Sequence, residues 1–123
     1  MTEILLVGIG GALGAIFRHL AGKITFEGVF PVATFLVNLL GCVLIGFVAA
    51  IALKRGVSSH FLLLLKTGFL GGFTTFSTFS LEAVMLFQNK HYFEGGMYIL
   101  LSGLFCLLGV ILGQYLAFLI FKN

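Results

Sequence analysis

Long runs without charge are the feature that most constrains what this chain can fold into. No charged residue occurs between Glu27 and Lys54, or between Glu94 and Lys122. About 17–25 apolar residues are enough to cross the hydrocarbon core of a bilayer as a helix. The sequence therefore predicts an all-α membrane protein with four transmembrane helices per subunit. The expected helices cover residues 4–21, 30–53, 61–88 and 93–121.

The composition leaves no soluble alternative. Of 123 residues, 60% are hydrophobic and 9% are charged, whereas a soluble domain carries about 25% charged residues. A chain of this size has too little interior to hide so much apolar surface from water. We expect a single four-helix transmembrane domain over residues 1–123, with the lipid bilayer as its solvent. The scattered basic residues form no patch, so no nucleic acid is expected as a partner.

The charges in the connections give almost no orientation signal. Lys and Arg in short loops set the orientation of a membrane protein, and here the two sides carry similar numbers. Both orientations are therefore accessible, which would permit an antiparallel homodimer. One side holds Lys54, Arg55 and Lys122, with Lys66 near it, and the other holds Arg18, Lys23 and Lys90.

A polar stretch interrupts the third helix near its middle. Residues 71–80 read GGFTTFSTFS, with two adjacent glycines and five hydroxyl side chains. Irregular backbone at membrane depth is tolerated only where it is buried in protein or lines a watery cavity. Broken helices of this kind hold ions, because freed carbonyls attract cations and helix N-termini attract anions. The stretch predicts a break in this helix; the alternative is a continuous helix whose hydroxyls bond to their own backbone.

Three further side chains are candidates for an ion pathway. Phe76 and Phe79 are three residues apart and share a helix face; their positively polarised ring edges can favour an anion, although lipid or core packing explains such pairs equally. Asn38 carries an amide inside an apolar run, so it should face protein, a pore or an ion. Contact between helices is as good an explanation for Asn38 as a role in a pore.

Helices three and four add more polar candidates. Tyr98, Ser102 and Cys106 recur at intervals of four, which makes either a pathway or a packing seam. Glu82 is an ionisable residue inside a span, which is a functional candidate by default, with an interfacial carboxylate as the alternative. Nothing resembles catalytic machinery: the histidines have no metal-ligand spacing and no serine has an evident base. We expect no enzyme.

The stretch 71–80, followed by Glu82, resembles the signature of the Fluc (CrcB-type) fluoride channel family. Gly10 and Gly14 followed by Arg18 are similar to that family's first helix. Thr34, Asn38 and Gly41 resemble its second helix, so the resemblance covers nearly the whole chain.

The resemblance implies a passive fluoride-selective channel that exports toxic cytosolic fluoride across the plasma (inner) membrane of a microbial cell. It implies an antiparallel, dual-topology homodimer with two pores along its interface. A structural sodium ion at the dimer centre would be held by the backbone carbonyls of Gly71 and Thr74. The implied fluoride pathway includes the Asn38 amide, the edges of Phe76 and Phe79, Thr75, Ser77, Thr78, Tyr98, Ser102 and Glu82.

Two residues depart from that pattern. Cys106 stands where the polar track has a hydroxyl, and a thiol is a weaker donor. Lys66 lies before the break, where it either attracts anions or extends its charge toward water. The alternative function is a small multidrug-resistance-type dual-topology cation/proton antiporter. In that class the essential Glu lies in the first helix and the aromatic cage usually includes Trp, which this chain lacks.

Overall fold

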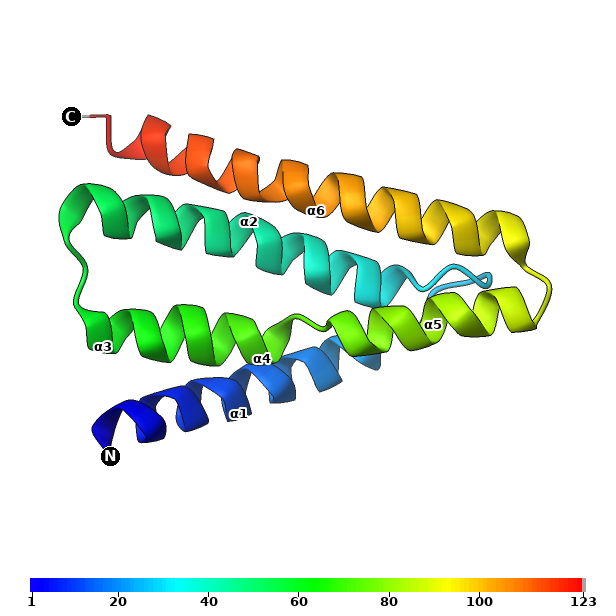
Figure 1. Cartoon of the computed structure of the whole chain (residues 1–123), viewed down its shortest axis with the longest axis horizontal. Helices are drawn as coiled ribbons and strands as arrows, with labels where there is room; N and C mark the ends of the chain where they lie inside the picture. Colours follow the sequence, from blue (N-terminus) through cyan, green and yellow to red (C-terminus); the bar gives the residue numbers. More distant parts are fainter. Residues whose placement is uncertain (123) are drawn as a thin grey trace.

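The computed structural model describes residues 1–122 and is helical along most of this length. Seven helical segments follow one another, with labels as in Figure 1. They are α1 (Thr2–Gly22), α2 (Val32–Arg55), α3 (Ser59–Leu62), the π-helical η1 (Leu63–Leu70), α4 (Gly71–Phe73), α5 (Phe76–Gln88) and α6 (Tyr92–Ile120).

These segments form four rods, because α3, η1, α4 and α5 follow one line. Within residues 1–122, four helices are long and apolar enough to cross a membrane: α1, α2, the composite rod Ser59–Gln88, and α6. The prediction of four transmembrane helices is confirmed. The predicted ends differ from the observed ends by at most two residues, which is the usual uncertainty of a helix terminus.

The rods pack in two close pairs (Figure 1). α6 lies along α2, and the two helices run in the same direction, while α1 crosses the first half of the third rod. Glycines make both contacts close. A Cβ at Gly14 would overlap the carbonyl oxygen of Phe69, and one at Gly113 would overlap that of Val43. Gly14 and Gly113 therefore let the helices of each pair approach closely.

The third rod is broken at Thr74 and Thr75, as the hydroxyl-rich stretch predicted. Both residues have extended backbone, with ψ 156° at Thr74 and φ −149° at Thr75. Figure 1 shows the break as a short irregular segment between α4 and α5. The π-helical turn of η1, before the break, was not predicted from the sequence.

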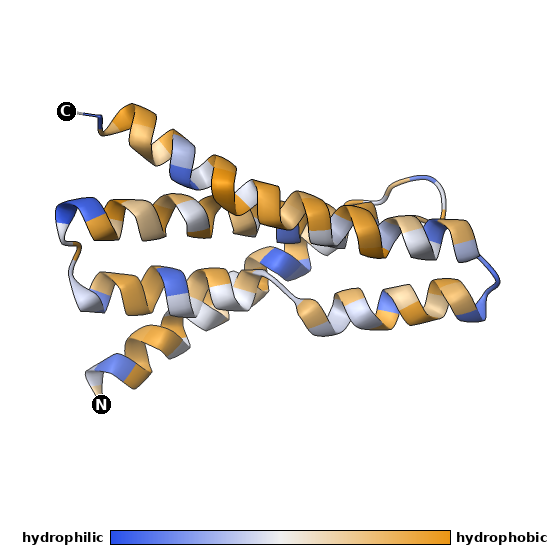
Figure 2. Cartoon of the chain, turned by 45° about the horizontal axis from the view of Figure 1, so that its top comes forward, coloured by the Kyte–Doolittle hydropathy of each residue, from blue (hydrophilic) through white to orange (hydrophobic). Residues whose placement is uncertain are grey.

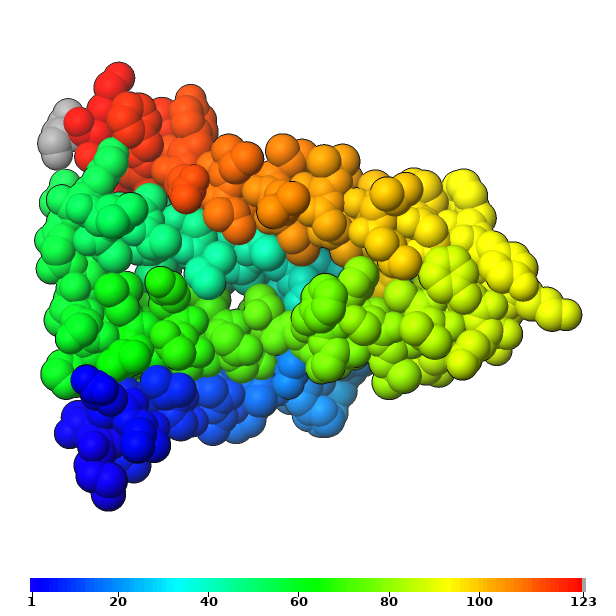
Figure 3. Space-filling model, viewed as in Figure 1, coloured from blue at the N-terminus to red at the C-terminus, as the bar shows by residue number. Residues whose placement is uncertain are grey.

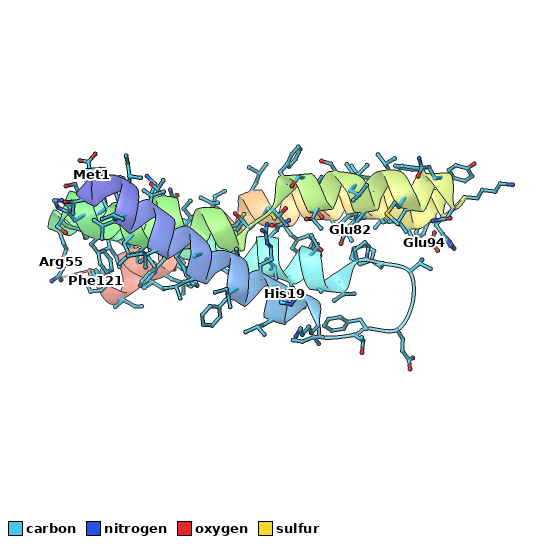
Figure 4. The ribbon with its side chains drawn as sticks, turned by 90° about the horizontal axis from the view of Figure 1, so that it is seen from below. Met1, His19, Arg55, Glu82, Glu94 and Phe121 are labelled. Carbon is cyan, nitrogen blue, oxygen red and sulfur yellow. The ribbon has the colours of Figure 1, made fainter. Side chains whose placement is uncertain are left out.

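Most of the length of each rod is apolar, and hydrophilic residues are concentrated at the ends and connections, with isolated ones along the rods (Figure 2). Figure 4 shows Met1, Arg55 and Phe121 at one end and Glu94 at the other. At the first end Lys54 Nζ lies 4.3 Å from the centre of the Phe118 ring, and the Arg55 guanidinium lies 4.8 Å from that of Phe121. These cation–π contacts join the end of α2 to the end of α6.

A single chain has a small core. Its main cluster is Ala83, Leu86 and Tyr98, with Phe30, Phe35 and Phe79 packed against it. Only 11% to 28% of the residues in the most apolar window of each span are buried. Most of the apolar surface must therefore be covered by lipid or by another protein chain.

Candidate functional site: the helix break and the groove beside it

Each half of the broken helix is closed by its own threonine. Thr74 donates from both its backbone N–H (3.0 Å) and its hydroxyl (2.9 Å) to the carbonyl of Leu70, which ends the first half. Thr75 Oγ1 accepts the N–H of Thr78 at 3.1 Å and so caps the N-terminus of α5. The break therefore arises from local hydrogen bonding by the residues that form it.

Asn38 of α2 completes the break from the side. Its Oδ1 accepts the N–H of Thr75 at 2.8 Å, and its Nδ2 donates to the carbonyl of Thr75 at 3.0 Å. The amide oxygen thus replaces the partner that the Thr75 N–H loses at the break, and the amide nitrogen is an additional donor to the Thr75 carbonyl, which as N-cap of α5 also accepts the first hydrogen bond of that helix. An amide nitrogen carries two hydrogens, so one Nδ2 hydrogen is left for another acceptor. Asn38 serves as a contact between helices and at the same time lies beside the break.

The break also changes the surroundings of two backbone carbonyls. In a continuous helix the N–H of Thr75 would donate to the carbonyl of Gly71, but here it donates to Asn38. The carbonyl of Thr74 accepts a long hydrogen bond from Arg18 Nη1, at 3.4 Å. Gly71 is exposed, and a side chain there would meet nothing within 4 Å.

A groove of about 720 Å³ runs along the break. It lies between the third rod and the α2–α6 pair, on the face seen in Figure 3. Seven of the predicted site residues line it: Asn38, Gly71, Thr74, Thr75, Phe76, Phe79 and Ser102. Cys42, Lys66 and Cys106 also line it.

Four other predicted site residues lie outside the groove lining. Ser77 and Thr78 have their hydroxyls 3.3 Å and 3.1 Å from Thr75 Oγ1, so they belong to the cap of α5. Tyr98 is completely buried, and its hydroxyl donates to Glu82 Oε2 at 2.7 Å. Glu82 Oε1 accepts from Thr34 Oγ1 at 2.8 Å. Their hydrogen bonds cap α5 and join it to α2 and α6.

The rings of Phe76 and Phe79 differ in how far they are buried. Phe76 is 80% exposed, whereas Phe79 is partly buried and its ring centre lies 4.9 Å from that of Tyr98. The two ring centres are 5.6 Å apart with their planes at 41°. Phe79 is thus held in place by the core, while Phe76 would need a further partner to be fixed.

Glu82 lines a second hollow, apart from the groove. This hollow has a volume of about 490 Å³ and lies near the connection between α5 and α6. Its lining consists of Val29, Pro31, Glu82, Met85, Leu86, Asn89 and His91. Glu82 thus lines this hollow, while Phe79, three residues earlier on α5, lines the groove.

Ser102 provides a donor without a partner. Its hydroxyl is buried in the wall of the groove and has no hydrogen-bond partner among residues 1–122. A buried polar atom left in this way implies a missing acceptor, water or ion. One helical turn further along α6, Cys106 presents a thiol to the same groove.

Sequence reasoning missed two contacts of this site. Thr34 was noted as a neighbour of Asn38, but not as a donor to Glu82. Arg18 was not expected to reach the carbonyl of Thr74, which is 56 residues away in the chain. The i, i+4 spacing of Thr34 and Asn38 places both on one face of α2 and could have indicated the contact of Thr34. Nothing in the sequence indicated the contact of Arg18.

Comparison with known proteins places these features in a family. The model of the family described as "CrcB-like protein, Camphor Resistance (CrcB)" matches residues 5–114. Three relatives, each called "Fluoride-specific ion channel FluC", match over almost their whole length. The protein of Dehalococcoides mccartyi is 44% identical over 131 aligned positions, covering 100% of this chain and 98% of the relative. The protein of Ruminiclostridium cellulolyticum is 46% identical (95% and 93% covered), and that of Helicobacter pylori 41% (92% and 91%).

Proposed function

The chain belongs to the CrcB-like family, and we propose that it is a fluoride-specific ion channel and not an enzyme. The observation that carries this proposal is the groove at the helix break, where an amide, an unpartnered hydroxyl and two phenylalanine rings line one space. The relatives named as fluoride-specific channels cover more than 90% of the chain.

The donors of the groove match what fluoride needs. Fluoride is small and strongly hydrated, so its water must be replaced by closely spaced donors that hold it only loosely. The free Nδ2 hydrogen of Asn38, the hydroxyl of Ser102 and the ring edges of Phe76 and Phe79 are the donors on this wall. The N-terminus of α5 adds a positive partial charge at the break.

Glu82 and Tyr98 act on this pathway indirectly. Both carboxylate oxygens of Glu82 accept hydrogen bonds from side chains of two neighbouring helices. The carboxylate thereby fixes α5 and, with it, the ring of Phe79. Glu82 and Tyr98 are therefore positioning residues. Ser77 and Thr78 are positioning residues too, because their hydroxyls contact the Thr75 hydroxyl that caps α5.

The groove of one chain is open, and a second copy would close it. The exposed ring of Phe76 and the largely apolar surface of the spans need a cover, and the weak charge bias permits opposite orientations. A dual-topology homodimer with a pathway on each side of its interface satisfies both conditions.

A sodium ion at the centre of that dimer would rest on backbone oxygens. The family resemblance implies the backbone carbonyls of Gly71 and Thr74 as the ligands, and a hard cation such as sodium suits oxygen donors. Gly71 fits, because its carbonyl lacks its helical partner and its surroundings are open. The carbonyl of Thr74 is less available to a cation, because it already accepts a hydrogen bond from Arg18. One chain offers two such oxygens and an antiparallel pair would offer four.

The test separates a passive channel from a proton-coupled antiporter. Liposomes loaded with potassium fluoride and carrying the purified protein are diluted into fluoride-free buffer at equal pH, and a fluoride electrode records efflux after valinomycin is added. A channel releases fluoride only once potassium can leave with it, and at a rate independent of a pH gradient. Fluoride efflux that requires a pH gradient and no potassium pathway would favour proton-coupled fluoride transport, and no fluoride efflux at all would favour the cation/proton antiporter.

A further inference from the structure

The two cysteines of the chain face each other across the seam between α2 and α6. Cys42 and Cys106 are both free thiols, and both line the groove. A Cβ at Gly109, three residues after Cys106, would lie 3.4 Å from the Cβ of Cys42. Positions three apart share a helix face, so Cys106 lies on the face of α6 turned toward Cys42. Both thiols therefore lie in the wall of one groove, on the sides of α2 and α6 that are turned toward each other.

Each cysteine lies one helical turn beyond a donor of the proposed fluoride pathway. Cys42 follows Asn38 by four residues, and Cys106 follows Ser102 by four. Because α2 and α6 run in the same direction (Figure 1), both thiols lie on the same side of those donors. The pair therefore sits in the groove wall about 6 Å along the helices from Asn38 and Ser102.

We propose that Cys42 and Cys106 form a two-thiolate site for one soft metal ion of the linear-coordinating class, such as Hg²⁺ or Ag⁺. Thiolate sulfur selects soft metal ions, whereas hard cations prefer oxygen. Two opposed ligands satisfy a linear ion without a third side chain.

Binding is a proton exchange without oxidation. For Hg²⁺, two S–H bonds break, two Hg–S bonds form, and two protons leave to water in the groove. The metal keeps its charge state and no external reductant or oxidant is needed. If the proposed function holds, an ion bound one turn from the donors would obstruct the fluoride pathway by its size.

Metal retention tests the site without using transport. Purified, reduced protein in detergent is mixed with mercuric chloride, treated with excess of a monothiol, desalted and weighed by intact mass spectrometry. We expect one mercury per wild-type chain. The single variants Cys42→Ser and Cys106→Ser should lose the mercury, because a monothiol extracts an ion held by one sulfur. The double variant has no thiol and gives the baseline. Equal retention by a single variant, or two ions per wild-type chain, would overturn the shared site.

Alanine variants guard against a folding defect. Cys42→Ala and Cys106→Ala must elute in size-exclusion chromatography as wild type does and still lose the metal. Fluoride efflux is then measured with and without mercuric chloride. Loss of efflux in wild type that is absent in the double serine variant supports the site in the pathway. Metal retention by a wild type that passes no fluoride would defeat the channel proposal and leave the metal site standing, so the two failures are distinguishable.

Discussion

Tyr98 donates its buried hydroxyl to Glu82 Oε2 at 2.7 Å, and this bond joins α6 to α5 directly behind the groove. Thr34 of α2 donates to the other oxygen, so three helices meet at one carboxylate. Hydrogen bonds to a charged acceptor contribute about 1.5–3 kcal/mol each.

The first prediction follows from this junction. Tyr98→Phe leaves one oxygen of Glu82 without its donor and should lower the stability of the folded chain by about 1.5–3 kcal/mol. Thermal unfolding in detergent, followed by circular dichroism, measures the change. Tyr115→Phe is the matched control, because Tyr115 is exposed on the same helix and its replacement should leave the unfolding temperature unchanged. Equal shifts in the two variants would remove the special role of the Tyr98 hydroxyl.

Asn38 carries the second prediction. Asn38→Leu keeps the approximate volume but removes both hydrogen bonds to Thr75 and the donor facing the groove. If a single donor is worth about 1.4 kcal/mol to the passing ion, fluoride efflux should fall about tenfold. Gln114→Leu makes the same chemical change at an exposed site on α6 and should not alter efflux. Wild-type efflux in Asn38→Leu would place the pathway elsewhere.

The third prediction concerns the rings. Phe79→Ile and Phe76→Ile keep an apolar side chain but remove the polarised ring edge. A loss of about 1 kcal/mol would slow efflux roughly fivefold. Phe93→Ile repeats the change at a ring that lies outside the groove and should have little effect. The proposal for the rings fails if all three variants conduct alike.

The fourth prediction tests the dimer and its central ion together. Within one chain the surroundings of Gly71 are open, so Gly71→Arg should fold as a monomer but place a positive charge where a second copy and a cation are proposed. Light scattering after size-exclusion chromatography should report a dimer for wild type and for Gly71→Ala, and a monomer for Gly71→Arg. A normal dimer of the arginine variant would count against the cation site.

Much of this architecture could be predicted from the sequence because the signals are local. Charge-free runs set the four helices, and five hydroxyls within ten residues indicated a break, since threonines at a break can satisfy the backbone themselves. The sequence singled out Asn38 because an amide inside a membrane span needs a partner, but it left open whether that partner is another helix or a pore.

Other features could not be predicted because they depend on distant partners or on backbone geometry. The apolar residues of η1 fit a π-helix as well as an α-helix. The stripe formed by Tyr98, Ser102 and Cys106 was left open between a pathway and a seam, and the structure divides it: Tyr98 points to Glu82, while the other two line the groove. Only the packing of α6 against α5 and α2 decides which residues of the stripe line the groove and which are buried between helices.

Selective release of fluoride is the measurement that tests the central claim most directly. Liposomes carrying the purified protein are loaded with potassium fluoride or with potassium chloride, and efflux of each anion after valinomycin is recorded with its own electrode. The proposed channel predicts rapid loss of fluoride with chloride retained, and loss of that efflux in Asn38→Leu. Retention of fluoride by liposomes that contain well-folded protein, or equal loss of both anions, would contradict it.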